Sequence, residues 1–446
     1  MRTFVGIDLG STTTKAVILD EEERVVGRGL TNSRSDYDVA CAIARGEALA
    51  DARFMLCRRA LEEQPLAPEG RERVLDALEH RFRLAQHLVQ LSRLRAAMQR
   101  QLPVIERLFP GASLGPAVAE IAAAMEQGAS ERLADPEVRR SQFFRDNAGS
   151  AYAALAEART ALRVRPYEAL IGVFDKAILE VENQALDLPL ADVLEGEVDG
   201  RSLDHDLTAA GLSAAEVQRL RPALAEAIGA RIEVVNEVGT GYGRARLPFH
   251  KDQIRSEILC HGLGAHHMFP GTATVLDIGG QDTKAIQVDP QGIVSSFQMN
   301  DRCAAGCGRY LGYIADEMNL GVHELGPLAM RSTRSLRINS TCTVFAGAEL
   351  RERLTLGQAR EDILAGLHRA IILRAMSLLA RSGGVQDELT FTGGVANNQA
   401  AVAALRRLVD ENYGAGITLN ISPSSIYTGA LGAALFALRA LAAPAA

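Results

Sequence analysis

A short motif occurs twice in this chain of 446 residues, once near its start and again far downstream. The first copy, DLGSTTTK, spans residues 8–15, and the second, DIGGQDTK, spans residues 277–284. Each follows a β-rich run, Thr3–Ile7 or Ala273–Leu276, and leads into a short apolar run that ends in aspartate. We therefore expect a strand, a tight glycine turn and a second strand at both places. Because the two copies share five positions, duplicated α/β halves explain them better than two unrelated hairpins.

The sequence between the two copies has a different character. From about residue 41 to residue 226 it is rich in Ala, Arg, Leu and Glu, and strand-like runs are nearly absent. Apolar residues recur there at spacings of three and four, as at Leu75, Leu78 and Phe82, which is typical of amphipathic helices. We expect a large all-helical insertion here, followed by a return of strand character at residues 231–235.

Glycine-rich segments mark the C-terminal half. A loop is expected at residues 239–244, with the sequence GTGYGR. A strand is expected at Leu389–Thr392, breaking at Gly393 and Gly394 and entering a helix through residues 397–398. This alternation of strands and helices is typical of a layered α/β fold.

Composition narrows the class of protein. With 47% hydrophobic and 23% charged residues, the chain can bury a core, and its length suits two or three domains. A net charge of −7 lacks the basic signature of nucleic-acid-binding proteins. No run approaches the roughly 18 apolar residues of a membrane-spanning helix, and Asp8 comes too early for a signal peptide. We expect a cytoplasmic protein with neither a nucleic-acid nor a membrane partner.

The first motif carries groups that suit a polyphosphate. Gly10 lets the backbone approach a ligand closely, and Ser11, Thr12 and Thr13 add N–H and hydroxyl donors. Lys15 either neutralises phosphate charge or is simply an exposed strand residue. The motif therefore predicts contacts to ATP from all five residues.

Carboxylates accompany both motifs. Asp8 ends a strand, where it can hold Mg²⁺ through water, and Asp277 occupies the same place in the second copy. Gln281 can orient a water molecule, and Asp282 adds a further carboxylate. Positioning of the attacking water supplies much of the catalysis of phosphoryl transfer. We therefore expect Asp8, Gln281 and Asp282 to be catalytic, and Asp8 and Asp277 to hold Mg²⁺ through water.

The remaining predicted ATP contacts are glycines. Gly279 and Gly280 form the turn of the second copy, and Gly393 and Gly394 would let a nucleoside pack against the backbone. A plain turn explains the last pair equally well when it is taken alone. As a third glycine turn in the expected order, it supports a nucleotide site.

The ordered turns resemble the nucleotide-binding fold shared by actin, sugar kinases and heat-shock chaperones. More narrowly, residues 277–284 together with DRCAAG at 301–306 and NSTCTVFA at 339–346 resemble the activator ATPases of benzoyl-CoA reductases and 2-hydroxyacyl-CoA dehydratases. The resemblance covers residues 1–55 and 225–446. It implies an α/β protein with a duplicated nucleotide-binding fold and a large all-helical insertion.

The insertion distinguishes two branches of this family. Dehydratase activators are compact chains that lack it, whereas this chain, with NSRSDY at residues 32–37 leading into the insertion, resembles the larger ATPase subunits (A subunits) of ATP-dependent benzoyl-CoA reductases. The resemblance thus implies a first ATPase lobe at 1–55 plus 225–270, a helical insertion at 56–224, and a second lobe at 271–446.

Two cysteines carry the redox expectation. Cys303 and Cys342 each precede a helix-like run, and a helix N-terminus favours the thiolate form. Two thiolates make half of a four-cysteine [4Fe–4S] site. The family resemblance implies that Cys303 and Cys342 are ligands of a [4Fe–4S] cluster that a partner subunit shares.

The other cysteines and the histidines carry weaker signals. Cys307 could pair with Cys303 on a metal, but we expect it to be a neighbour of the cluster or inert. Cys41, Cys57 and Cys260 are expected to be buried small residues. The histidines His261, His266 and His267 are loosely spaced like metal ligands, and we expect ordinary polar residues.

The resemblance implies an ATP-hydrolysing protein that drives low-potential electrons through the cluster toward benzoyl-CoA, whose ring is reduced elsewhere. Its implied partners are a smaller homologous ATPase subunit, catalytic benzoyl-CoA-binding subunits, and reduced ferredoxin as electron donor. The implied cofactors are ATP, Mg²⁺ and the shared [4Fe–4S] cluster. Alternatives are an activator ATPase of a 2-hydroxyacyl-CoA dehydratase, a small-molecule kinase of the same fold, and a chaperone-like or cytoskeletal ATPase without redox chemistry.

Overall fold

The computed structural model describes residues 1–33, 36–110, 113–135, 138, 144–160, 164–186, 188–241, 248–300, 307–334, 336–338 and 343–442. They form two compact units. The helical unit comprises Gly29–Ile232 with Met1, and the two-sheet unit comprises Arg2–Arg28 and Glu233–Ala446. The lobe boundaries expected from the sequence stay a prediction.

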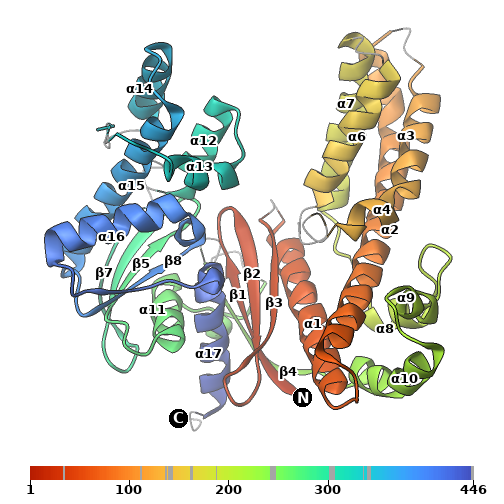
Figure 1. Ribbon diagram of the computed structural model, residues 1–446, viewed down its shortest axis with the longest axis horizontal. Coiled ribbons are helices and arrows are strands. Elements are labelled where there is room, and N and C mark those ends of the chain that lie inside the picture. Colours follow the sequence, from red (N-terminus) through yellow and green to blue (C-terminus); the bar gives the residue numbers. More distant parts are fainter. Residues whose placement is uncertain are drawn as a thin grey trace. The chain divides into compact units, whose positions relative to one another are not determined.

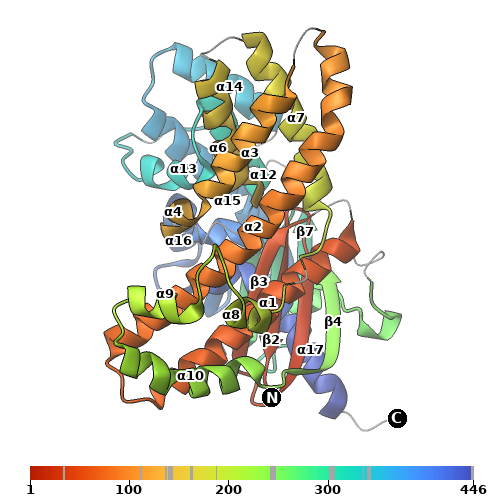
Figure 2. The same ribbon diagram turned by 90° about the vertical axis from the view of Figure 1, so that its right-hand side faces the viewer.

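The helical unit contains the expected all-helical insertion. Helices α2, α3, α6 and α7 of this unit lie side by side (Figure 2). Leu75, Leu78 and Phe82, whose spacing indicated an amphipathic helix, are all buried in its core. Its helices are α1 (Tyr37–Glu62), α2 (Pro68–Leu108), α3 (Gly115–Gln127), α4 (Ala129–Ala134), α6 (Phe144–Thr160), α7 (Val164–Glu182), α8 (Leu190–Glu195), α9 (Leu203–Ala209) and α10 (Ala214–Gly229).

The two-sheet unit contains nearly all the strands (Figure 1). They are β1 (Arg2–Leu9), β2 (Thr13–Leu19), β3 (Val25–Asn32, whose second half belongs to the helical unit), β4 (Glu233–Gly241), β5 (Thr274–Ile278), β6 (Thr283–Val288), β7 (Val294–Asn300), β8 (Glu388–Thr392) and β9 (Thr418–Asn420). Its helices are α11 (Glu257–Met268), α12 (Gly308–Met318), α13 (Val322–Ala329), α14 (Thr343–Thr355), α15 (Arg360–Ser382), α16 (Gln399–Tyr413) and α17 (Thr428–Ala442), with 3₁₀ turns at Lys251–Gln253, Gly394–Asn397 and Pro423–Tyr427.

Both sheets repeat one arrangement. In the first, of order β3-β2-β1-β4, strand β1 pairs antiparallel with β2 and parallel with β4. In the second, of order β7-β6-β5-β8-β9, strand β5 pairs antiparallel with β6 and parallel with β8. The duplication predicted from the two motifs is therefore confirmed in the strand pairing.

One sequence expectation about this unit was wrong. Gly239–Gly241 do not begin a loop, because they extend β4 in parallel register with Ile7–Leu9 of β1. Pairing with a central strand overrides the preference of glycine for turns. The remaining residues of the expected loop, 242–244, lie outside the described residues.

Two helical segments of the described chain are long and apolar enough to span a membrane by length and composition, Arg360–Ser382 and Pro423–Leu441. They are 67% and 56% buried inside the fold. Core helices of globular proteins are buried in the same way and pass the same test of length and composition.

Helices α11 and α17 join the two sheets. Helix α11 packs on strands of the second sheet, α17 packs on β1, β2 and β4 of the first, and the two helices contact each other along their length (Figure 1). A Cβ at Gly264 of α11 would lie 2.1 Å from the Thr428 oxygen, and one at Gly432 of α17 would lie 1.8 Å from the Cys260 oxygen. Glycine is therefore the residue that permits this backbone contact.

We predict that Gly264→Ala destabilises the two-sheet unit by at least about 3 kcal/mol, because a methyl group cannot fit against a backbone oxygen. Gly312→Ala in α12 is the matched control, since a Cβ there meets nothing within 4 Å. That control should be neutral or stabilising by up to about 1 kcal/mol. Urea unfolding of both variants measures the difference, and equal stabilities would contradict the close helix contact.

The helical unit has a pH-sensitive core histidine. His87 is 5% exposed and contacts the Phe144 ring edge-on, and its Nε2 has no hydrogen-bond partner among the described residues. Burial, assisted by the charge of Arg132, lowers the pKa of His87 from 6.5 to about 4. Folding therefore favours the neutral ring.

Stability of the helical unit should accordingly fall as the pH drops from 6.5 toward 4, where the unfolded chain binds a proton that the folded chain does not. The expected loss attributable to His87 is about 3 kcal/mol. Exchange protection of α2 amides, measured at both ends of this pH range, should depend less on pH in His87→Leu than in wild type. An unchanged pH dependence in the variant would disprove the assignment.

Candidate functional site

The two motifs end equivalent strands in equivalent surroundings. Asp8 of β1 stands opposite Thr240 of β4, and Asp277 of β5 stands opposite Thr392 of β8. The next residue on each parallel neighbour is a glycine with positive φ, +110° at Gly241 and +83° at Gly393. These positions therefore favour glycine on conformational grounds.

Close packing also requires these two glycines. A Cβ at Gly241 would lie 2.4 Å from the Leu9 oxygen and 2.8 Å from Asp8 Oδ1. A Cβ at Gly393 would lie 2.3 Å from the Ile278 oxygen and 3.0 Å from Asp277 Oδ1. The repeat thus extends to a Thr-Gly pair on each neighbouring strand. Those dipeptides are visible in the sequence and could have been found there.

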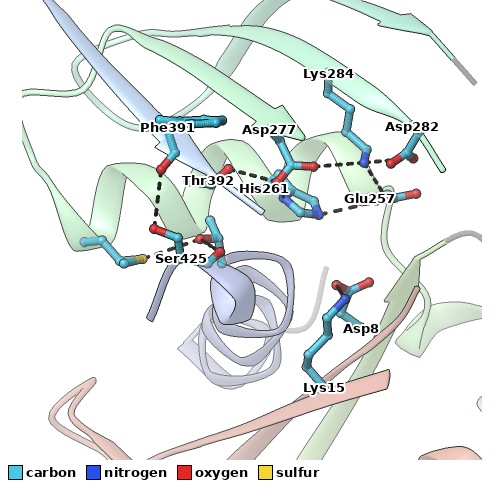
Figure 3. A network of polar contacts seen from close by, with 12 residues as sticks. Asp8, Lys15, Glu257, His261, Asp277, Asp282, Lys284, Phe391, Thr392 and Ser425 are labelled. Carbon is cyan, nitrogen blue, oxygen red and sulfur yellow. Dashed lines mark hydrogen bonds and ion pairs between the residues drawn. The ribbon is translucent and has the colours of Figure 1, made fainter. Parts of the chain in front are cut away.

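Asp277 is enclosed by protein groups. Its Oδ2 accepts from Lys284 Nζ at 3.1 Å, and its Oδ1 accepts from Thr392 Oγ1 at 2.9 Å (Figure 3). His261 Nδ1 lies 3.3 Å from the same Oδ1, close enough for charge attraction but without straight hydrogen-bond geometry. Burial alone would raise the pKa of Asp277, yet His261 and Lys284 hold that pKa well below its usual range.

Lys284 is the centre of this network. Its side chain is 2% exposed, and its Nζ lies 2.9 Å from both Glu257 Oε1 and Asp282 Oδ2, besides Asp277 (Figure 3). Burial opposes the charged form, but the surrounding carboxylates, Asp277 and Glu257 foremost, raise the pKa of Lys284 well above its usual value. Three carboxylates share this one ammonium, which fixes the second motif against α11.

Helix α11 supplies two residues of the network that the motifs did not indicate. Burial raises the pKa of Glu257, although Lys284 and His261 act against the rise. For His261, burial lowers the pKa, but the charge of Asp277 outweighs it and the net shift is upward. We expected His261 to be an ordinary polar histidine, and the structure instead places it between the two motif carboxylates. A Cβ at Gly429 would lie 2.8 Å from His261 Nε2 and 3.0 Å from Asp8 Oδ2, so both side chains lie against the same point of the chain.

Asp8 differs from its counterpart. It is 3% exposed, and its ion pair is Lys15 Nζ at 3.5 Å from Oδ2 (Figure 3). Its Oδ1 is buried and has no hydrogen-bond partner within the described part of the chain. A buried carboxylate oxygen without a partner calls for water or a ligand-borne donor. Lys15 is 13% exposed, so it is a partner of Asp8 and not a fully exposed strand residue.

The two turns contact each other. A Cβ at Gly280 would lie 2.2 Å from Thr12 Oγ1 and 3.6 Å from Ser11 Oγ, so the hydroxyl side chains of the first turn lie directly against the second. Gly10 is also constrained, because a Cβ there would lie 2.8 Å from the Thr13 backbone oxygen and 2.9 Å from Lys15 Nζ. The structure therefore brings most of the predicted phosphate-binding residues together.

The other predicted residues are placed as follows. Thr13, Gly279, Gln281 and Asp282 are half-buried at the turns, Gly393 is buried, and Gly394 is exposed at the start of the 3₁₀ turn that follows β8. Their roles toward ATP stay predictions.

The cysteines divide into two groups. Cys303 and Cys342 lie outside the described residues, so their predicted role stays a prediction. Cys41, Cys57 and Cys260 are buried, as expected of small core residues. Cys307 is also buried and occupies the N-cap of α12, and its expected place beside a cluster stays a prediction. Burial raises the pKa of Cys57 to about 11 and that of Cys260 to about 12, so both thiols are poor nucleophiles and metal ligands. Among the described residues, no three His, Cys, Asp or Glu side chains form a metal site.

Comparison with known proteins identifies the lineage. The model of the BadF/BadG/BcrA/BcrD ATPase family matches residues 5–437. The chain belongs to this ATPase family. Its similarity to solved structures confirms the expected fold class, a duplicated nucleotide-binding α/β fold with a large helical part. Component A of (R)-2-hydroxyglutaryl-CoA dehydratase from Acidaminococcus fermentans aligns with a TM-score of 0.51 at 24% identity, over 99% of this chain and 100% of that one.

Individual relatives favour one branch. The (R)-2-hydroxyglutaryl-CoA dehydratase activating ATPase of Acidaminococcus fermentans is 44% identical over 202 residues, 45% of this chain and 75% of that one. The 2-hydroxyisocaproyl-CoA dehydratase activator of Clostridioides difficile is 41% identical over 208 residues, 47% of this chain and 75% of that one. One of the benzoyl-CoA reductase subunits of Thauera aromatica is 30% identical over 213 residues, 48% and 75% of the two chains. These identities favour the dehydratase-activator alternative over the benzoyl-CoA reductase expectation.

We predict that the ion pairs of the two motifs differ in their contribution to stability. Lys284→Met leaves the buried carboxylates of Asp277 and Glu257 and the half-buried one of Asp282 without their cation, and it should cost about 3–5 kcal/mol. Asp8→Asn keeps the side-chain volume and removes a single 3.5 Å ion pair, so stability should stay within about 1 kcal/mol of wild type. Urea unfolding without nucleotide measures both, and equal losses would show that the two motifs are equivalent structural locks.

Proposed function

We propose that this protein is an activator ATPase that uses ATP hydrolysis to deliver low-potential electrons to a 2-hydroxyacyl-CoA dehydratase. The observation that carries the ATPase part is the pair of touching glycine turns beside the buried, unpartnered Oδ1 of Asp8. Membership of an ATPase family and the higher identity to two dehydratase activators support the rest.

The residues of the first turn fit Mg²⁺-ATP. Asp8 Oδ1 has the chemistry to accept hydrogen bonds from water molecules bound to Mg²⁺, which neutralises phosphate charge when present. Lys15, 3.5 Å from Asp8, brings a cation to the same side of the turn. Thr12 and Ser11 present hydroxyl donors toward the second turn.

The second turn would orient the attacking water. Gln281 is half-buried beside Asp282, whose carboxylate is held by Lys284 at 2.9 Å. Because that ion pair fixes Asp282, the turn is preorganised before ATP arrives. Asp277 has both oxygens engaged by protein groups, so its contact with Mg²⁺ would be less direct than that of Asp8.

Cys303 and Cys342 remain the proposed [4Fe–4S] ligands on the strength of the motif resemblance. A second ATPase chain would supply the other two thiolates, and a reduced ferredoxin would be the donor. The cytoplasmic location stays a prediction.

A second candidate keeps the same ATPase site and a different acceptor. The helical unit, residues 29–232, is the feature by which the sequence resembles the larger ATPase subunit of benzoyl-CoA reductases. Electrons would then pass to subunits that reduce the ring of benzoyl-CoA.

Acceptor assays separate the two candidates. The full chain, reduced anaerobically and supplied with Mg²⁺-ATP, should restore activity to a 2-hydroxyacyl-CoA dehydratase that has been freed of its own activator. Restoration of benzoyl-CoA ring reduction alone would favour the second candidate, and restoration of neither would contradict both.

We predict that Asp8→Asn slows ATP hydrolysis by roughly 100-fold or more, because the oxygen that accepts from the Mg²⁺-bound waters is replaced or misoriented. Phosphate release at saturating Mg²⁺-ATP measures the rate. Asp20→Asn is the matched control, since Asp20, directly after β2, is also a buried carboxylate but is paired with Arg24 at 2.8 Å. Equal rates in Asp8→Asn and wild type would remove Asp8 from the site.

A further inference from the structure

Helix α12 is hydrogen-bonded to the turn of the second motif, residues 279–282, which is the second phosphate turn of the proposed function. The Gly308 and Arg309 N–H groups donate to the Gly279 and Gly280 carbonyls, both at 2.8 Å. A Cβ at Gly308 would lie 3.2 Å from the Gly279 oxygen, so the helix starts against the turn itself. Any displacement of this turn therefore moves the first turn of α12.

Helices α12 and α14 lie beside each other in the two-sheet unit (Figure 1). At their contact, the Tyr313 ring of α12 covers Gly347 of α14. A Cβ at Gly347 would lie 2.7 Å from Tyr313 Oη, 2.9 Å from its Cε1 and 3.2 Å from its Cζ. The missing side chain on α14 thus makes the space that the tyrosine fills.

One turn further along both helices, a polar contact continues the pairing. Arg351 Nη1 donates to Glu317 Oε2 at 2.8 Å and to Tyr313 Oη at 3.3 Å. Tyr313 and Glu317 are four residues apart on α12, and Gly347 and Arg351 are four residues apart on α14. Each pair therefore lies on one face of its helix, and the two faces meet in register.

We propose that Tyr313, Glu317, Gly347 and Arg351 form a clip that makes α14 follow the movement of α12, and thereby of the second phosphate turn. The inference rests on the proposed ATPase function and names the residues that would carry nucleotide-dependent movement away from the site. These four are positioning residues, since none of them contacts the turns.

Tyr313 is 37% exposed, so its contact with Gly347, and not burial of the whole ring, is its contribution to the clip. Arg351 is 57% exposed, so water screens its ion pair with Glu317 and the pair alone holds the helices weakly. The Tyr313 ring over Gly347 resists relative displacement of the helices, because movement in one direction brings it against the α14 backbone. The ion pair then sets the register.

Hydrogen–deuterium exchange of the full chain tests the clip. In wild type, exchanging ADP for a non-hydrolysable ATP analogue should change the protection of peptides from both α12 and α14. In the double variant Tyr313→Ala with Glu317→Gln, α12 should keep its response and α14 should lose most of its own. ATP hydrolysis should stay near the wild-type rate, because the altered residues lie outside the site.

Two neighbouring substitutions serve as controls. Asp316→Asn on α12 and Glu352→Gln on α14 change exposed charges beside the clip and should leave both responses intact. A variant in which α14 still responds as in wild type would overturn the clip, and so would a wild-type protein in which α12 alone responds. A wild-type chain that neither binds nor hydrolyses ATP would overturn the proposed function and this inference with it.

Discussion

The site depends on the backbone contact between α11 and α17. Because Gly264 and Gly432 have no side chain, the backbones of the two helices come into direct contact. Helix α11 packs on the second sheet and α17 on the first. As a result, His261 of α11 and Asp8 of β1 both lie against Gly429 of α17. Without it the two motifs, far apart in sequence, would not share one site.

Duplication has produced two Asp–Lys pairs with different surroundings. Lys284 is enclosed with Asp277, Asp282 and Glu257, and this network holds the second turn in place. Asp8 keeps one oxygen without a partner in the described structure. The fixed second turn suits the task of holding a water molecule in position. The Oδ1 oxygen of Asp8 suits the binding of a hydrated cation.

The repeat and the helical insertion could be predicted because they are patterns of local sequence. The strand–turn–strand units follow from DLGSTTTK and DIGGQDTK, and the insertion follows from apolar spacing such as Leu75, Leu78 and Phe82. Glu257 and His261 were not identified, since their role comes from the helix crossing that brings α11 to the second motif. The branch of the family could not be decided from the sequence, because the insertion indicates one branch, whereas the higher identity to dehydratase activators favours the other.

The proposed function requires a [4Fe–4S] cluster through which ATP hydrolysis at this site drives electron transfer. The presence of this cluster is tested by the iron and acid-labile sulfide content of the anaerobically purified protein. Its visible spectrum is recorded before and after addition of dithionite. We expect a brown protein with about four irons per pair of ATPase chains. Its spectrum should bleach on reduction, and its iron should be lost in Cys342→Ala. A colourless protein that still hydrolyses ATP would contradict the redox function and indicate a kinase or another motor of this fold.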